Sequence, residues 1–181
     1  MGLDLLKLFG LKNGSSSESL EHGSLFTRLS ELLSGLSERE VAVITGISGL
    51  LGQVAYADLE ISDKEICKIK SVLQSNLGLD EQHAELVVTV TKELTRELAG
   101  IEDFRYTRLI NEHCTKDEKM QLLKALFEIA SADDSISSDE DLAIGNIARD
   151  LLLTREDFIS ARADYTRFLD VIKNLPKKDT G

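Results

Sequence analysis

The chain is poor in the residues that strands and strand boundaries need. Its 181 residues include one proline, no tryptophan and only 5% aromatic side chains. Because strands favour aromatic residues and are commonly bounded by proline, this composition favours helices. A hydrophobic share of 42% and a charged share of 29% are ordinary for a globular protein. The length is sufficient for one domain with a real core.

Cysteine and long apolar runs are also scarce. Cys67 and Cys114 are too few for a disulfide framework, and neither lies in a Cys-x-x-Cys or Cys/His metal spacing. The sequence has no run of about 18 apolar residues, which argues against a membrane-spanning helix. The first residues lack the basic region of a secretory signal, and Asp4 and Lys7 interrupt their apolar stretch. We therefore expect a protein of the reducing cytoplasm.

Positive charge is the third shortage. Lysine and arginine together number 21 against 32 aspartate and glutamate residues, which gives a net charge of −11. A surface this acidic repels phosphate backbones, so we do not expect nucleic acid as a partner. An acidic balance suits cations, basic protein partners or plain solubility. We expect one or more protein partners.

A stretch rich in glycine and serine, residues 11–23, divides the chain. Such a composition predicts a flexible linker. The linker separates an apolar head, residues 1–10, from a single domain at residues 24–176 and a tail at residues 177–181. The apolar part of the head, residues 3–9, spans barely two helical turns and has no net positive charge, so we expect only weak membrane association. Docking on its own bundle, or disorder, is the simpler expectation.

The strongest positive feature is a segment that occurs twice. Residues 57–65 read ADLEISDKE, and residues 132–140 read ADDSISSDE. The offset, 133 minus 58, is 75 positions. Since each copy lies between two helical patterns, the repeat predicts two helix–acidic turn–helix units.

Helix start signals recur along the chain. In a capping box, a hydroxyl accepts from the amide three residues later, and a Glu there reaches back to the cap amide. Four matches precede helical apolar patterns: Ser37/Glu40, Ser62/Glu65, Thr115/Glu118 and Ser137/Glu140. Asp80 and Thr154 are candidate simple caps. Apolar spacing predicts helices near residues 25–35, 38–57, 63–76, 81–99, 103–113, 116–131, 138–152 and 155–174.

These elements form two halves with one order: helix, acidic turn, helix, helix. The first half covers residues 38–99 and the second covers residues 116–174, with the helix near 103–113 between them. Each half has apolar faces that it cannot cover by itself. The predicted fold class is therefore all-α, a compact helical bundle with internal pseudo-symmetry.

Acidic side chains crowd both turns, with four carboxylates in residues 58–65 and five in residues 133–141. Carboxylates gathered in a turn are what a hard cation such as Ca²⁺ or Mg²⁺ requires. Helix capping is nearly as good an explanation, because Glu65 and Glu140 are capping-box partners and first-turn acids favour the helix dipole. An EF-hand is excluded, since the twelfth position of its loop would be an isoleucine.

The repeated pattern Ala-Asp-x-x-Ile-x-x-x-Glu, between an apolar helix and an Ile/Leu-rich helix, resembles the TerB-like family of tellurite-resistance proteins. The resemblance covers most of the chain, residues 38–172. It implies an all-helical bundle with pseudo-symmetry, no known catalysis and a role in stress resistance. It also implies that acidic residues bind a divalent cation, and these correspond to Asp58, Glu65, Asp133 and Glu140.

The chain departs from the family after each Asp of the pattern. The family usually has glycine there, whereas this chain has Leu59 and Asp134. Glycine permits a positive φ, which Asp tolerates moderately and Leu poorly. We therefore expect the first turn, and any ion site built on it, to differ from the family geometry.

Three glycines of the helix near residues 38–57 form neither a nucleophile elbow nor a dinucleotide-binding loop. Together they cost a helix about 3 kcal/mol relative to alanine. We therefore expect Gly46, Gly49 and Gly52 to allow close helix packing. Cys67 adjoins an apolar helix face, and we expect it to be a buried small residue.

No catalytic group stands out. The neighbours His113 and Cys114 would point about 100° apart on a helix, with no assured acid to orient them. The sequence therefore predicts a non-enzymatic binding or scaffold module that responds to a divalent cation such as Ca²⁺. The alternative is an enzyme with a cryptic acidic metal site, in which the four acids of the turns would meet at the floor of an apolar pocket.

Overall fold

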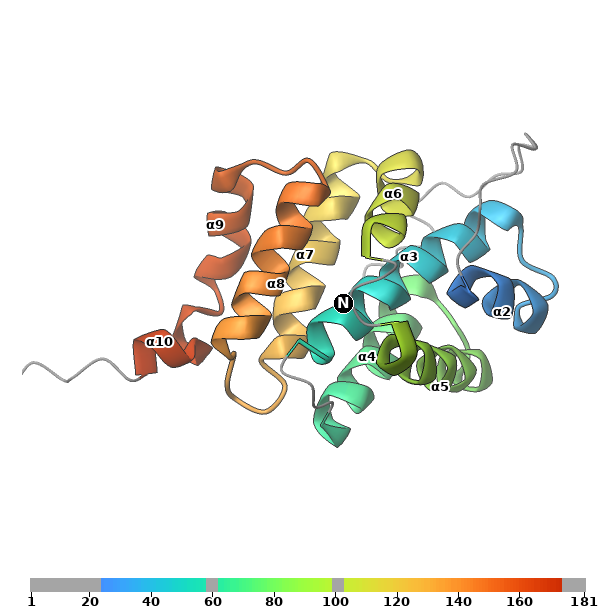
Figure 1. Ribbon diagram of the computed structural model, residues 1–181, viewed down its shortest axis with the longest axis horizontal. Helices are drawn as coiled ribbons and strands as arrows, with labels where there is room; N and C mark the ends of the chain where they lie inside the picture. The colour runs from blue at the N-terminus through green and yellow to red at the C-terminus, as the bar shows by residue number, and fades with distance from the viewer. Residues whose placement is uncertain (1–23, 58–61, 99–102, 174–181) are drawn as a thin grey trace, which may run out of the picture.

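The computed structural model describes residues 24–57, 62–98 and 103–173, so the expected head, linker and tail lie outside the described residues. Within those ranges the regular elements are helical, with two isolated β-bridges, which confirms the all-α fold class. The helices are α2 (Ser24–Leu32), α3 (Glu38–Ala55), α4 (Asp63–Leu77), α5 (Glu81–Leu98), α6 (Asp103–His113), α7 (Lys116–Ala130), α8 (Ser138–Asp150), α9 (Arg155–Ala163), the 3-10 helix η1 (Thr166–Phe168) and α10 (Asp170–Lys173) (Figure 1). None of the described helices is both long enough and apolar enough to cross a membrane.

The helix starts follow the capping signals. All four predicted capping boxes are formed, with both hydrogen bonds present in each. Thr154 forms a fifth box with Asp157, and Asp80 Oδ1 accepts from the His83 N–H at 2.8 Å. The helix ends follow the prediction less closely, since α3, α7 and α8 stop one or two residues earlier than expected.

The prediction of one helix over residues 155–174 is wrong. After α9 the chain forms η1 and α10, with Leu169 extended between them (φ −67°, ψ 123°). The Ile136 N–H donates to the Phe168 carbonyl at 2.8 Å, and the Asp170 N–H donates to the Ile136 carbonyl at 3.0 Å. A continuous helix would use the Phe168 and Asp170 backbone groups internally. Pairing with the second acidic turn therefore interrupts the helix.

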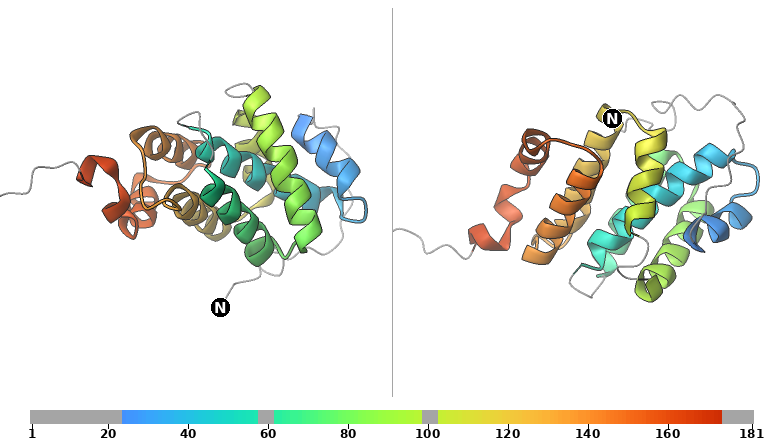
Figure 2. Two further views of the ribbon diagram at one scale, coloured as in Figure 1. Left: turned by 90° about the horizontal axis from the view of Figure 1, so that it is seen from below. Right: turned by 45° about the horizontal axis from the view of Figure 1, so that its top comes forward.

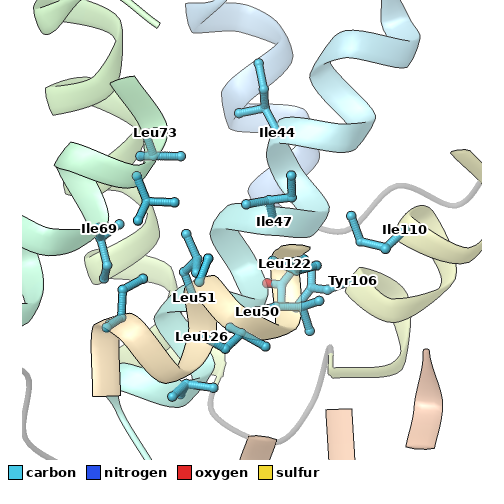
Figure 3. Close-up of a cluster of buried hydrophobic side chains, with 14 of the residues drawn as sticks. Ile44, Ile47, Leu50, Leu51, Ile69, Leu73, Tyr106, Ile110, Leu122 and Leu126 are labelled. Carbon is cyan, nitrogen blue, oxygen red and sulfur yellow. The ribbon is translucent and has the colours of Figure 1, made fainter. Parts of the chain in front are cut away.

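The core is built around α3. Between Val41 and Ala55 every side chain except Gln53 is buried. The reason is that α3 packs against α2, α4, α5, α6, α7 and α8. Figure 3 shows Leu50 and Leu51 of α3 among side chains of α4, α6 and α7. A helix that is apolar on all sides needs neighbours on all sides. Because α4 and α5 belong to the first half and α7 and α8 to the second, both halves contribute to one core.

Close approach of α6 explains two of the glycines in α3. A Cβ at Gly46 would lie 2.8 Å from Ile110 Cδ1, and one at Gly49 would lie 2.5 Å from the Tyr106 ring. Both distances are shorter than van der Waals contact. The packing prediction is confirmed for Gly46 and Gly49.

The two halves repeat one arrangement of helices. In the first half α4 and α5 pack on α3, and in the second half α8 and α9 pack on α7. The halves meet where α3 contacts α7, and they also exchange contacts between α3 and α8 and between α4 and α7. Figure 2 places α2 and α10 at opposite ends of the molecule.

Candidate functional site

The helix ends that flank the two acidic turns lie at one end of the bundle. Each turn follows the C-terminal end of a core helix, α3 or α7, and precedes the start of α4 or α8. Because α4 contacts α7 and α3 contacts α8, these flanks are neighbours in space. In Figure 1 the start of α4 and the turn between α7 and α8 lie along the lower edge. We call this region the acidic end.

A groove of about 560 Å³ opens at the acidic end. It runs between the start of α4 and the end of α7, and an ion pair of 2.6 Å joins Lys68 Nζ to the Glu128 carboxylate across it. The lining residues are Asp63, Lys64, Cys67 and Lys68 on one side and Glu128, Ser131 and Ala132 on the other.

Cys67 lines this groove and is exposed, so the prediction that it is buried is wrong. The buried face of α4 includes Glu65, Ile69 and Leu73, which are spaced four residues apart. Cys67 lies two positions from both Glu65 and Ile69, which places it about 200° around the helix from each. The apolar residues next to Cys67 in the sequence therefore did not indicate whether Cys67 lies on the buried or the exposed side of α4.

Glu65 and Glu140, two of the predicted ion ligands, are buried and serve as helix caps. Glu65 Oε2 accepts from the Ser62 N–H at 2.7 Å, and Glu140 Oε2 accepts from the Ser137 N–H at 2.8 Å. The two side chains are 7% and 6% exposed. Each carboxylate thus satisfies an amide that would otherwise have no partner at the helix start.

Asp133, the third predicted ligand, is exposed on the second turn. Its Oδ1 accepts from the Ser135 N–H at 3.2 Å. The next residue, Asp134, has a positive φ of 69°. This is the conformation for which the family uses glycine and which aspartate tolerates. Leu59, the corresponding residue of the first turn, lies outside the described residues.

The described members of the predicted ion site do not converge. Asp58 lies outside the described residues, and Glu65, Asp133 and Glu140 do not line the groove. Across residues 24–57, 62–98 and 103–173, no three His, Cys, Asp or Glu side chains are grouped so that they could hold a metal ion. The ion site stays a prediction.

Two basic side chains reach the second turn from later parts of the chain. Lys173 Nζ donates to the Asp134 carbonyl oxygen. Arg162 forms a two-pronged ion pair with Asp141, at 2.7 and 2.6 Å. Residues 133–141 themselves include no lysine or arginine. Partners 39 and 21 residues away give no local spacing signal, because such a signal relates residues three or four apart on one helix.

Cys114 and His113, at the end of α6, are not poised for nucleophilic catalysis. Burial raises the pKa of the Cys114 thiol to about 12 and lowers the pKa of the His113 imidazole. The thiolate is the nucleophilic form of cysteine. The Cys114 side chain is therefore protonated at neutral pH.

The chain matches a known protein family. The family described as tellurite resistance protein TerB matches residues 38–163, which is more than half of the chain. The matched range runs from the start of α3 to the end of α9, and it leaves out α2, η1 and α10. No curated protein and no solved structure matches the chain.

Proposed function

This chain belongs to the TerB family, and from that premise we propose that it is a non-enzymatic binding module that responds to a divalent cation in tellurite resistance. The cation would act at the acidic end. The module would work in the cytoplasm with a protein partner and would not turn over a substrate.

The observation that carries the proposal is the position of the helices that flank the two repeats. α4 contacts α7 and α3 contacts α8, so helices next to two segments 75 positions apart in the sequence are neighbours in space. Asp133, Asp134 and Asp139 are exposed there. Exposed carboxylates give a surface a negative potential, which attracts a divalent cation or a basic partner.

The acids of the site divide into two roles in this proposal. Asp58 and Asp133, the repeated Asp residues, are the direct ligands. Glu65 and Glu140 hold the starts of α4 and α8 through their cap hydrogen bonds and so orient the turns. Backbone carbonyls of a turn are suitable additional ligands, because Ca²⁺ takes six to eight oxygen atoms.

The position of the acids also supports a module over an enzyme. A cryptic metal enzyme would bring the four acids together at the floor of a pocket. Glu65 and Glu140 are engaged in caps, Asp133 lies at the surface, and none of these three lines the groove. Nothing in the described residues favours the enzyme as a second candidate.

Thermal unfolding with and without Ca²⁺ or Mg²⁺ tests the proposal. A cation at 100 times its Kd stabilises the folded state by about 2.7 kcal/mol, or roughly 5–10 °C for a domain of this size. We expect this gain in the parent and its loss in the double variant Asp58→Asn/Asp133→Asn.

The control is the double variant Asp117→Asn/Glu156→Gln. It makes the same change of charge at exposed residues in the first turns of α7 and α9, at the opposite end of the bundle. It should keep the full gain in melting temperature. An equal gain in all three proteins would mean general screening of charge, and no gain in the parent would overturn the cation response.

A further inference from the structure

The chain beyond α9 returns to the second acidic turn. We call residues 166–173, which contain η1, Leu169 and α10, the strap. In Figure 1 α10 lies beside the start of α8, at the acidic end. The strap follows the last residue of the family match, residue 163, so its contacts are a feature of this chain beyond the family range.

The strap meets the turn in the way that a bound peptide meets the edge of a strand. Leu169 is extended (φ −67°, ψ 123°) and forms a parallel β-bridge with Ile136. The Ile136 N–H donates to the Phe168 carbonyl at 2.8 Å, and the Asp170 N–H donates to the Ile136 carbonyl at 3.0 Å. Backbone bonds of this kind hold extended peptides on exposed strand edges whatever their sequence.

Two side chains of the strap make this contact selective for sequence. Leu169, between the two backbone bonds, is only 1% exposed and belongs to the same buried cluster as Ile136. Asp170, the next residue, accepts a hydrogen bond at its Oδ1 from Ser135 Oγ at 2.5 Å. A buried apolar side chain and a paired polar one distinguish one extended segment from another.

A basic side chain completes the contact. Lys173 Nζ donates to the carbonyl oxygen of Asp134, and it stands four positions after Leu169 (173 minus 169). The side chains of Asp133 and Asp134 are exposed on the same turn, so a positive charge is favourable there. The turn therefore fits an extended leucine that is followed directly by an acidic residue and, four positions after the leucine, by a basic one.

The strap has little internal support. α10 is four residues long, and a helix of that length is not stable by itself in water. Val171 and Ile172, its two apolar residues, are exposed (59% and 43%) and so add little burial. Order in the strap therefore depends on its contacts with the turn. Units of this kind open at lower free energy than the core does.

We propose that the second acidic turn is a docking site for an extended segment of a protein partner, and that the strap occupies this site in cis. The partner segment carries the same pattern of leucine, acidic residue and basic residue as the strap. It docks only when the strap has left, so its apparent affinity falls with the fraction of open molecules. Docking of this kind rests on the protein partner of the proposed function and does not involve the cation.

Binding of a fluorescent peptide of residues 165–173 to the full chain, measured by anisotropy in the presence of EDTA, tests the site. Leu169→Ala in the protein should bind this peptide at least about tenfold more tightly than the parent does, because loss of the buried leucine favours the open strap. Leu142→Ala, at an exposed position of α8, should bind it as the parent does. Equal affinity in the parent and Leu169→Ala, or no binding to either, would overturn the site.

Two further variants separate docking from a general loss of structure. Asp170→Ala keeps the buried leucine and removes the hydrogen bond from Ser135, so it should tighten peptide binding about three- to tenfold. A peptide that itself carries Leu169→Ala should lose its binding to both protein variants. If the altered peptide bound as tightly as the original, the leucine would not be the anchor, and the site would be overturned.

Amide hydrogen exchange shows whether the peptide takes the place of the strap. In the exchanged state the Ile136 amide donates to the peptide, whereas the Asp170 amide of the protein has lost its acceptor. Saturating peptide should therefore leave the Ile136 amide protected in the parent and raise exchange of the Asp170 amide. Peptide binding that changed neither amide would mean another site and would overturn the proposal.

Sedimentation of the full chain distinguishes a partner from a second copy. We expect a monomer, in which the strap docks on its own turn. A dimer that Leu169→Ala dissociates would mean that the strap docks on a second copy, and would overturn docking of a partner. Failure of peptide docking would leave the cation response standing, because melting temperatures measure that response separately.

Discussion

Leu152 illustrates strain at a single residue. It has a positive φ of 61° and is 79% exposed. It follows the end of α8, where its N–H donates to the Arg149 carbonyl and the Leu153 N–H donates to the Ala148 carbonyl. This is the Schellman arrangement, in which glycine is the usual residue because it has no Cβ.

We expect Leu152→Gly to stabilise the protein by about 1 kcal/mol, because the left-handed conformation costs a residue with a Cβ about 1–2 kcal/mol. The control is Leu142→Gly, which changes another exposed leucine inside α8 and should cost about 1 kcal/mol. Urea unfolding measures both. Loss of stability in Leu152→Gly would contradict the strain argument.

The two cysteines should differ in reactivity. Cys67 is exposed in the groove, whereas burial raises the pKa of the Cys114 thiol to about 12. Since only the thiolate reacts, an aromatic disulfide reagent at pH 8 should label one thiol in the native protein and two in denaturant. Cys67→Ser should abolish the native reaction, and Cys114→Ser should leave it intact. Rapid native labelling of Cys114 would show that it is accessible and ionised.

At the scale of the element, the close contact of α3 with α6 depends on glycine residues, which have no side chain. A Cβ at Gly49 would lie 2.5 Å from the Tyr106 ring, whereas a Cβ at Gly145 in α8 would meet Phe158 at an ordinary 3.7 Å. Both glycines lie inside helices. The pair therefore separates the effect of packing from that of helix propensity.

Gly49→Ala should destabilise the protein by about 1–3 kcal/mol, because overpacking exceeds the gain in helix propensity. Gly145→Ala should stabilise it by up to about 1 kcal/mol. Chemical denaturation followed by circular dichroism measures both. Stabilisation by Gly49→Ala would show that α6 shifts without cost to make room for the added Cβ.

At the scale of the whole molecule, the shared core predicts cooperative unfolding of the two halves. α3 of the first half is covered by α7 and α8 of the second, so neither half keeps its core when the other unfolds. The prediction of a single domain at residues 24–176 is tested by following each half separately.

A fluorophore on Cys67 reports on α4, in the first half. Leu123→Ala removes a fully buried side chain from α7, in the second half, and should cost about 2–5 kcal/mol. The fluorophore and the far-ultraviolet circular dichroism should show the same lowered urea midpoint. Leu142→Ala, at an exposed position of α8, should change little. If Leu123→Ala left the urea midpoint of the fluorophore signal unchanged, the two halves would unfold independently.

The sequence by itself determined the features whose causes lie within a few residues. A capping box involves groups three positions apart, so the starts of α3, α4, α7 and α8 could be predicted. The two halves were evident because the repeat keeps its register. Asp134 has a positive φ, the conformation that glycine permits and that aspartate tolerates. The capping role of Glu65 and Glu140 could also be predicted, because each carboxylate binds an amide three positions away.

Tertiary structure alone decided the features that depend on distant partners. The helix expected after residue 155 breaks because Leu169 and its neighbours pair with Ile136, 33 positions away. Cys67 is exposed because the packing of α4 against α3, α5 and α7, and not the apolar neighbours of Cys67 in sequence, selects the buried face. Lys173 reaches the second turn across 39 positions. Local spacing cannot reveal such contacts, because they form only after the chain has folded and loop closure has brought their ends together.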